Sequence, residues 1–321
     1  LNLFDQGFWK ELQQKTLSSG ETHLFELLTK TALHAKAEGT VTNYTNSLRR
    51  WIEFARVKSF NVFPASVIDV SLFISHLSST YKSSSVIQSS YCALKWVHDI
   101  AGIHNPMENK FLQNLVEGAK REHAKPVSKK APVTSEALEE CCTKYQGCDT
   151  LTVRRDISIA LLLFAGFLRY NEIADLKIQD VVICDTHLQL TIRKSKTDQY
   201  RKGNELVIHR SNKITCPVLN LEKYMRVASI SLDHSANFLF RPVTHTKAGY
   251  KLIDRNKPLS QTRARESIIG RLQEFMGDAN ISLHSFRSGG GGLPKQPMPK
   301  CPTAVGNDMA DGSRIQPRTV T

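Results

Sequence analysis

Three short stretches of the sequence carry basic side chains that could bind an anion such as a phosphate. The first, residues 166–180, places Arg169 directly after a strongly apolar run, with Glu172 and Leu176 at helical spacing. A guanidinium beside so apolar a stretch is costly unless it is paired or bound to an anion. The pattern therefore favours either an anion site at Arg169 or a structural Arg169–Glu172 pair.

The second stretch, residues 192–203, is a strongly basic turn between two strand patterns. Its candidate cations are Lys194, Lys196, Arg201 and Lys202. A basic turn of this kind can reach a phosphate backbone, and a lysine held against a phosphate can act as a general acid. The alternative is that these cations only solvate the turn.

The third stretch, residues 282–290, reads SLHSFRSGG and places His284 three residues before Arg287. On a helix this spacing puts both side chains on one face, where an imidazole and a guanidinium can clamp an anion. One such pair often arises by chance, so its meaning depends on the other two stretches.

The elements that must position these residues form two groups. Residues 21–123 are expected to fold as a helical bundle, with helical patterns at residues 40–60, 67–77, 84–100 and 111–119, the first of them capped by Thr40. Residues 1–20 are an N-terminal extension. Residues 124–133, rich in lysine and holding two prolines, indicate an extended and mobile linker.

Residues 134–290 are expected to form an α+β domain with one small antiparallel sheet. Helical patterns cover residues 135–143, 156–167, 217–229 and 261–276, and strand patterns cover residues 181–184, 188–193 and 205–209. The predicted fold class is therefore mainly α, an N-terminal helical bundle plus this α+β domain. Residues 291–321, rich in proline and glycine, are expected to be disordered.

The composition indicates a polyanionic partner. The chain has 321 residues, 43 Lys plus Arg and 30 Asp plus Glu, which gives a formal net charge of +13. Nucleic acid is the first candidate partner, an anionic membrane surface the second, and a merely solvated basic surface the alternative. Arg49, Arg50 and Lys95 in the helical bundle are candidate contacts to DNA, although each could simply belong to an exposed face.

Cysteine usage and hydropathy further limit the class of protein and its compartment. The seven cysteines are odd in number and form no CxxC pairs, which favours ordinary thiols in a reducing compartment over disulfides or a zinc site. No apolar run reaches the length of a membrane span. Because the sequence begins with Leu1, we expect the true start to lie upstream.

Taken in order and spacing, the three stretches resemble the boxes of the tyrosine recombinase (phage integrase-like) family, over about residues 21–290. The strings FLRYNEIADL, SKTDQYRKG and HSFRSGG are most similar to recombinases of eukaryotic mobile elements. The resemblance implies that residues 21–123 are a SAM-like core-binding domain and residues 134–290 a catalytic domain. Arg169, Lys196, His284 and Arg287 match the family's catalytic residues, and Lys194 competes with Lys196 as the hairpin lysine.

The family breaks and rejoins DNA strands by transesterification, in which a tyrosine attacks a backbone phosphate. The resemblance implies that the two arginines stabilise charge on the nonbridging oxygens, the lysine protonates the departing 5′-oxygen, and the histidine assists proton transfer. It implies double-stranded DNA as the partner, no metal or other cofactor, and a synaptic tetramer in intact relatives. The expected location is the nucleus in a eukaryote, and otherwise the cytoplasm with the chromosome.

The sequence departs from the family after Arg287. The family has a His or Trp there and a tyrosine nine positions later, but no tyrosine follows Tyr250 in this chain. No residue matches the nucleophile, since Tyr170, Tyr200 and Tyr250 all precede its position. We therefore expect duplex binding without strand cleavage, and the tail through which relatives form tetramers does not match either. The alternative is a noncatalytic DNA-binding protein that retains the fold, and a DNA-unrelated interaction domain would require all three matches to be accidental.

The reading frame offers a cause for this departure. A shifted frame from Gly306 onward combines the last base of each codon with the first two bases of the next codon. The genetic code allows this shifted frame to encode KRHGRWKSDTAKDGY. Only the glycine at Met309–Ala310 is forced by the genetic code. This string holds a Trp and a Tyr at the family's spacing. The hypothesis is that the tail is an out-of-frame translation, with the shift in or near residues 288–292.

Overall fold

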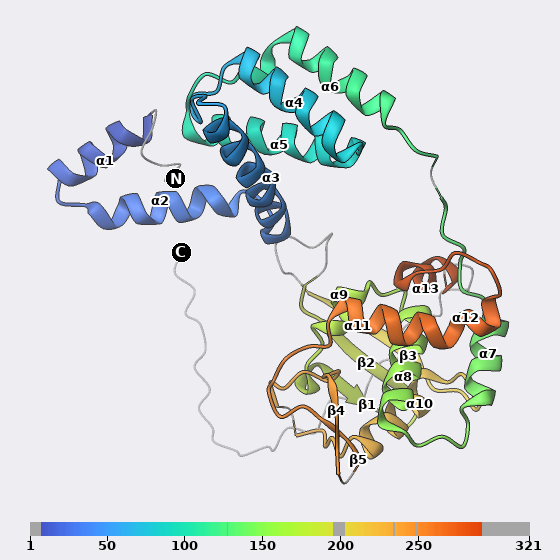
Figure 1. Ribbon diagram of the computed structural model, residues 1–321. Coiled ribbons are helices and arrows are strands. Elements are labelled where there is room, and N and C mark those ends of the chain that lie inside the picture. Colours follow the sequence, from blue (N-terminus) through green and yellow to red (C-terminus); the bar gives the residue numbers. More distant parts are fainter. Residues whose placement is uncertain (1–7, 127, 195–202, 234, 248, 291–321) are drawn as a thin grey trace, which may run out of the picture. The chain divides into compact units, whose positions relative to one another are not determined.

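A computed structural model of the chain describes residues 8–126, 128–194, 203–233, 235–247 and 249–290. The chain divides into two compact units, Leu1–Ser128 and Lys129–Thr321, and each is described by itself. The division falls inside the segment 124–133 that the sequence marks as a linker (Figure 1).

Unit 1 is helical throughout its described part. Its helices are α1 (Phe8–Ser18), α2 (Thr22–His34), α3 (Glu38–Val57), α4 (Val67–Tyr81), α5 (Ser84–Ala101) and α6 (Lys110–Glu122), with a 3-10 turn at Pro106–Glu108. Trp51 lies fully buried at the centre of the unit, where its ring meets the edge of Phe73 and its Nε1 donates to the carbonyl of Val62 at 3.0 Å. The aromatic and aliphatic positions spaced along α3, α4 and α5 therefore share one core.

Two features of unit 1 differ from the sequence expectation. Helix α3 begins at Glu38 with Ala37 as its N-cap residue, so Thr40 lies in the first turn and the prediction of a Thr40 cap was wrong. The extension of residues 1–20 contains α1, whose Trp9 is buried. Its indole Nε1 donates to the carbonyl of Ile100 at 2.5 Å, which attaches α1 to the end of α5. Apolar burial and this bond explain why the extension folds with the bundle.

Unit 2 is the mixed α and β domain that the sequence predicts. Its elements are α7 (Ser135–Lys144), α8 (Leu151–Ala165), α9 (Tyr170–Ala174), a 3-10 turn (Ile178–Asp180), β1 (Val181–Ile183), β2 (His187–Ile192), β3 (Asn204–His209), α10 (Pro217–Val227), β4 (Val243–Thr246), β5 (Gly249–Leu252), α11 (Gln261–Ala264), a π-helical turn (Arg265–Ile269), α12 (Gly270–Met276) and α13 (Leu283–Gly290). Strands β1, β2 and β3 form an antiparallel sheet in that order, and β4 pairs with β5.

Helix α8 is the centre of unit 2. Nearly all of its residues are buried, and α10 and α13 both pack against it. The predicted helix at 156–167 therefore exists, but it begins earlier, at Leu151, and ends at Ala165. The predicted helix at 261–276 is divided by the π-helical turn, and the β4–β5 hairpin was not predicted because its strands are short and only partly buried.

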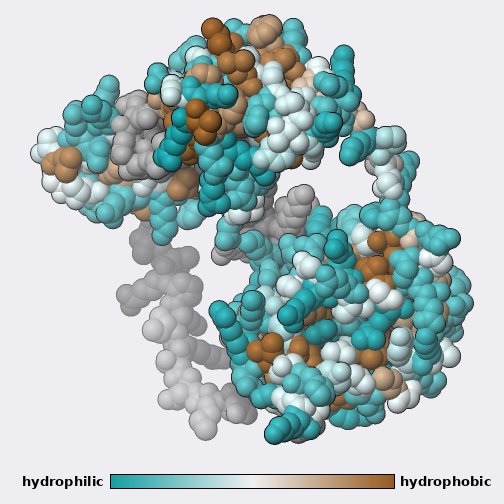
Figure 2. Space-filling view, in the orientation of Figure 1, coloured by the Kyte–Doolittle hydropathy of each residue, from teal (hydrophilic) through white to brown (hydrophobic). Residues whose placement is uncertain are grey.

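Hydrophilic side chains cover most of the visible face of both units, as Figure 2 shows. Hydrophobic residues gather on unit 1 over the starts of α4 and α6. Ile68 and Leu72 of α4 and Phe111 of α6 are 72%, 49% and 64% exposed.

Candidate functional site

Arg169 lies at the N-cap position of α9, directly after a tight turn at the end of α8. Its backbone N–H donates to Glu172 Oε2 at 2.8 Å, and its Nη1 donates to Glu172 Oε1 at 2.9 Å. The structural pair expected from the sequence is therefore present. The Glu172 side chain is 6% exposed and that of Arg169 is 28% exposed. Since only one guanidinium nitrogen has a partner among the described residues, the pair orients Arg169 and leaves most of its donors available.

His284 and Arg287 lie on α13, a helix that was not itself predicted, and their spacing on it puts both side chains on one face. Phe286, Leu283 and Ser285 are buried and hold the opposite face against the core, while His284 is exposed and Arg287 half-buried. Neither the imidazole nor the guanidinium has a hydrogen bond or ion pair within the described part of the chain. A half-buried guanidinium without a protein partner is suited to an anion.

Two glycines place α13 against the turn that carries Arg169. A Cβ on Gly289 would overlap the carbonyl oxygen of Val133 and lie 3.0 Å from the ring of Phe164. A Cβ on Gly290 would overlap the carbonyl oxygen of Phe164 and lie 2.9 Å from the ring of Phe167. Phe167 itself has a φ of 51° and lies two residues before Arg169. The end of α13 is thus packed onto the turn that leads into α9.

The hairpin between β2 and β3 supplies the second stretch only in part. Lys196, Arg201 and Lys202 lie outside the described residues, so their prediction stays untested. Lys194 is exposed just beyond the end of β2. Desolvation raises the pKa of the Asp175 carboxyl, and the nearby Lys194 ammonium opposes this rise. Because Asp175 is the C-cap residue of α9, Lys194 lies near the helix that Arg169 opens.

Arg49 and Arg50, two of the candidate DNA contacts of unit 1, lie on α3, and the third, Lys95, lies on α5. Arg49 on α3 is exposed and bonded to Asn46 at 2.8 Å, and Lys95 is exposed on α5, which packs against α3. Arg50 instead lies over the ring of Tyr81 at the end of α4, 5.5 Å from its centroid. The Arg50 guanidinium is therefore engaged with α4 and less available than the other two.

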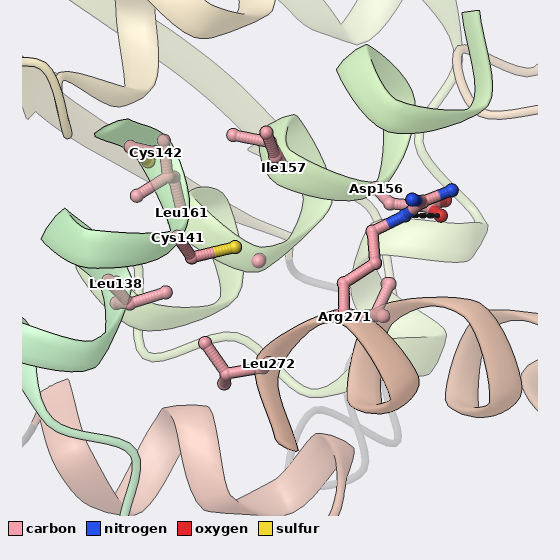
Figure 3. Close-up of a pocket in the computed structure, with 10 residues that line it drawn as sticks. Leu138, Cys141, Cys142, Asp156, Ile157, Leu161, Arg271 and Leu272 are labelled. Atoms are coloured by element: carbon pink, nitrogen blue, oxygen red, sulfur yellow. Dashed lines mark hydrogen bonds and ion pairs between the residues drawn. The ribbon is translucent and has the colours of Figure 1, made fainter. Parts of the chain in front are cut away.

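Sequence reasoning missed a buried charge network in unit 2. Asp156 on α8 is 1% exposed and accepts from Arg155 at 2.8 Å and from Arg271 of α12 at 3.1 Å. Figure 3 shows the Arg271 side chain extending to Asp156. The charged run Arg154–Asp156 at the start of an apolar helix is the sequence feature that indicates this network. Its distant partner, Arg271, could not be predicted from local spacing.

Beside this network lies a small cavity of about 10 Å³, which Leu138, Cys141, Cys142 and Leu272 help to line (Figure 3). That volume holds about one water molecule and no substrate. Burial raises the pKa of the Cys141 thiol to about 11 and that of Cys142 to about 12. Both thiols are protonated near neutral pH and are not nucleophiles, as the sequence suggests.

Tyr170 and Tyr250, two tyrosines that precede the family's nucleophile position, lie in different surroundings. Tyr170 is buried and its hydroxyl donates to the carbonyl of Leu259 at 2.7 Å, while burial raises its pKa. Tyr250 is 53% exposed on β5 and meets His245 across the hairpin at 4.9 Å between ring centroids. Tyr200 lies outside the described residues.

The described residues hold no group of three or more His, Cys, Asp or Glu side chains placed to bind a metal ion. No helix in the part of the chain that the structure covers is both long and apolar enough to span a bilayer.

Comparisons with known proteins give matches only among solved structures. No family model matches the chain, and no curated protein matches it. The chain is similar to XerA recombinase at 14% identity, with a TM-score of 0.35 over 83% of this chain and 79% of that one. A lambda integrase dimer bound to a COC' core site matches at 12% identity and a TM-score of 0.48, over 88% and 77%. XerH site-specific recombinase bound to a palindromic difH substrate matches at 16% identity and 0.49, over 78% and 67%. Likeness at this level concerns the fold, and activity has to be argued from the site residues.

Proposed function

We propose that this chain is a duplex-DNA-binding protein of the tyrosine recombinase type, whose site for a backbone phosphate is formed by Arg169, Lys196, His284 and Arg287. Arg287 is the observation that carries the proposal. It is half-buried, lacks a partner among the described residues, and lies on a helix packed against the turn before Arg169. Two guanidinium groups facing one phosphate can stabilise the charge that develops on its nonbridging oxygens.

The remaining residues of the proposed site have separate roles. His284, exposed one helical turn from Arg287, is proposed to exchange a proton with the reacting phosphate. Lys196 is proposed as the general acid, and Lys194 as the alternative because its charge acts near the end of α9. Glu172 is proposed to hold Arg169 in place rather than to contact the phosphate itself.

The proposal predicts binding without cleavage for the chain as printed, because no tyrosine occurs nine positions after a Trp or His that follows Arg287. Binding to a labelled duplex should weaken steeply with salt, since each neutralised phosphate releases counterions. Replacement of Arg287 by Ala should lower the slope of log affinity against log salt by about one. An unchanged slope and affinity would reject the phosphate site.

A suicide substrate, in which cleavage traps the enzyme on DNA, tests the second half of the proposal. We expect no covalent adduct from this chain, and an adduct would show that another group serves as nucleophile. Arg169→Ala in a frame-corrected version distinguishes the recombinase from the noncatalytic alternative. Loss of strand exchange would support the recombinase, and unchanged strand exchange would show that Arg169 has no catalytic role. A location with the chromosome, in the nucleus for a eukaryotic source, is proposed on the same grounds.

A further inference from the structure

The segment that leads into unit 2 is hydrogen-bonded to the segment that leads into α13. The N–H of Ala131 donates to the carbonyl of Asn280 at 2.9 Å, and the N–H of Val133 donates to the carbonyl of Ser285 at 3.0 Å. Lys130 Nζ also donates to the side-chain oxygen of Asn280. Residues 130–133, which we name the strap, were expected to be part of a mobile linker. Instead they are held along residues 280–285.

The strap also touches the far end of α13. Val133 is 1% exposed, and its carbonyl oxygen occupies the space that a Cβ on Gly289 would need. The strap therefore contacts α13 at Ser285 and at Gly289, on either side of Arg287.

Ser285 is the point at which the strap reaches those residues. It is 1% exposed, its Oγ accepts from the N–H of Ser282 at 3.0 Å, and its N–H donates to the carbonyl of Ser282 at 2.9 Å. The backbone of Ser285 is thus fixed on one side by the first turn of α13 and on the other by Val133. His284 directly precedes Ser285, and Arg287 follows two residues later.

The described part of helix α13 is too short to fix its own direction. It has eight residues, and isolated helices of this length are marginal in water, so tertiary contacts determine where this part lies. Among those contacts, the strap supplies directional hydrogen bonds, whereas the glycine contacts supply close packing. A small shift of a short helix displaces its side chains by an amount that matters for holding a reacting group.

We propose that the strap positions Arg287, and His284 with it, for the phosphate. The strap residues are positioning residues, because Val133 and Ala131 act through α13. The effect on DNA binding rests on the proposed function, whereas the contact with α13 does not. The competing explanation is that the strap only stabilises unit 2 as a whole.

A double-mutant cycle on the full chain separates the two explanations. Ala131→Pro removes the N–H that bonds Asn280, at a position where the following Pro132 already favours extended backbone. Ala131→Ser keeps the N–H and is the matched control. Affinity for a labelled duplex is measured for the wild type, A131P, A131S, R287A and the A131P/R287A pair.

We expect A131P to weaken duplex binding about fivefold and A131S to have no effect. In the R287A background, A131P should weaken binding by less than about a further twofold. The same loss in both backgrounds would mean that the strap acts independently of Arg287, and it would overturn the proposal. No loss from A131P would overturn it as well.

Hydrogen exchange without DNA keeps the test independent of the proposed function. A131P should speed exchange of amides in residues 283–290, while the amides of α8 and the A131S variant exchange as in the wild type. Equal acceleration in α8 would show general destabilisation and would reject the strap. If the wild type fails to bind duplex DNA, the proposed function fails, and the exchange result still decides whether the strap positions α13.

Discussion

Gly290 lies against the ring of Phe167, so the last turn of α13 closes over the turn that precedes Arg169. This contact joins two stretches that are more than a hundred residues apart in the sequence. Because of this contact, the helix that carries Arg287 and the turn that leads to Arg169 pack against each other.

The first prediction concerns this junction. Gly290→Ala should lower the free energy of unfolding of unit 2 by about 1–3 kcal/mol, because the added Cβ overlaps the Phe164 carbonyl and presses on the Phe167 ring. Urea unfolding followed by helical circular dichroism measures the loss. All three tryptophans, Trp9, Trp51 and Trp96, lie in unit 1, so their fluorescence should report an unchanged transition.

Gly147→Ala is the matched control for that experiment. Gly147 also lies in unit 2, and a Cβ there would meet nothing within 4 Å. It should leave the unfolding midpoint almost unchanged. If Gly290→Ala proved as stable as Gly147→Ala, the result would contradict the close packing of α13 against the turn before Arg169.

The second prediction separates the two arginines. Arg169→Ala should cost about 1–3 kcal/mol of stability, because it leaves the buried Glu172 carboxylate without its charged partner. Arg287→Ala should change stability by less than about 0.5 kcal/mol, because Arg287 has no partner within the described residues. Both should weaken duplex binding. Equal stability losses would contradict the difference in pairing between the two side chains.

Local pattern was enough to predict the site elements. The strands around residues 181–209 were predicted because β-branched residues alternate there, and the observed register pairs Leu190 with both Val181 and Leu206. A Glu three residues after Arg169 was sufficient to suggest their pair, whereas α13 was not predicted and only the shared face of His284 and Arg287 on a helix was expected. These features depend on residues that lie close together in the sequence.

Features that depend on distant partners could not be predicted. The start of α8 contains Arg155 and Asp156, which look unsuitable for a buried helix until Arg271, 115 residues later, joins the network. The strap illustrates the same point, because the lysine and proline content of residues 124–133 indicates a mobile linker. Its hydrogen bonds to Asn280 and Ser285 depend on the complete fold.

The third prediction concerns pH and unit 1. His98 is fully buried, its Nδ1 lies 2.7 Å from the Leu94 carbonyl, and its Nε2 accepts from the N–H of Ala65 at 3.2 Å. Desolvation lowers the pKa of His98, with the Leu94 carbonyl and Asp99 opposing this shift. The folded state therefore binds this proton less readily than the unfolded chain.

It follows that stability from His98 is present above the unfolded pKa, about 6.5, and is lost as pH falls through that value. Urea unfolding of unit 1, followed by tryptophan fluorescence between pH 7.5 and pH 5, measures this dependence. His98→Gln should be less stable at neutral pH but should show a flatter dependence over this range. A wild-type stability that rises on acidification through this range would contradict the assignment of a neutral His98.

The final prediction concerns the coding DNA. The shift is expected in or near the codons for residues 288–292, where glycine codons make a run of G bases likely. The next reading frame should then encode WKSDTAKDGY or a close variant, with its tyrosine nine positions after the tryptophan. Sequencing across these codons decides the matter, and a different string or a shift outside this region would refute it. A corrected chain should form the covalent DNA adduct that we do not expect from the printed chain, because the tyrosine would then follow the residues proposed to hold the phosphate.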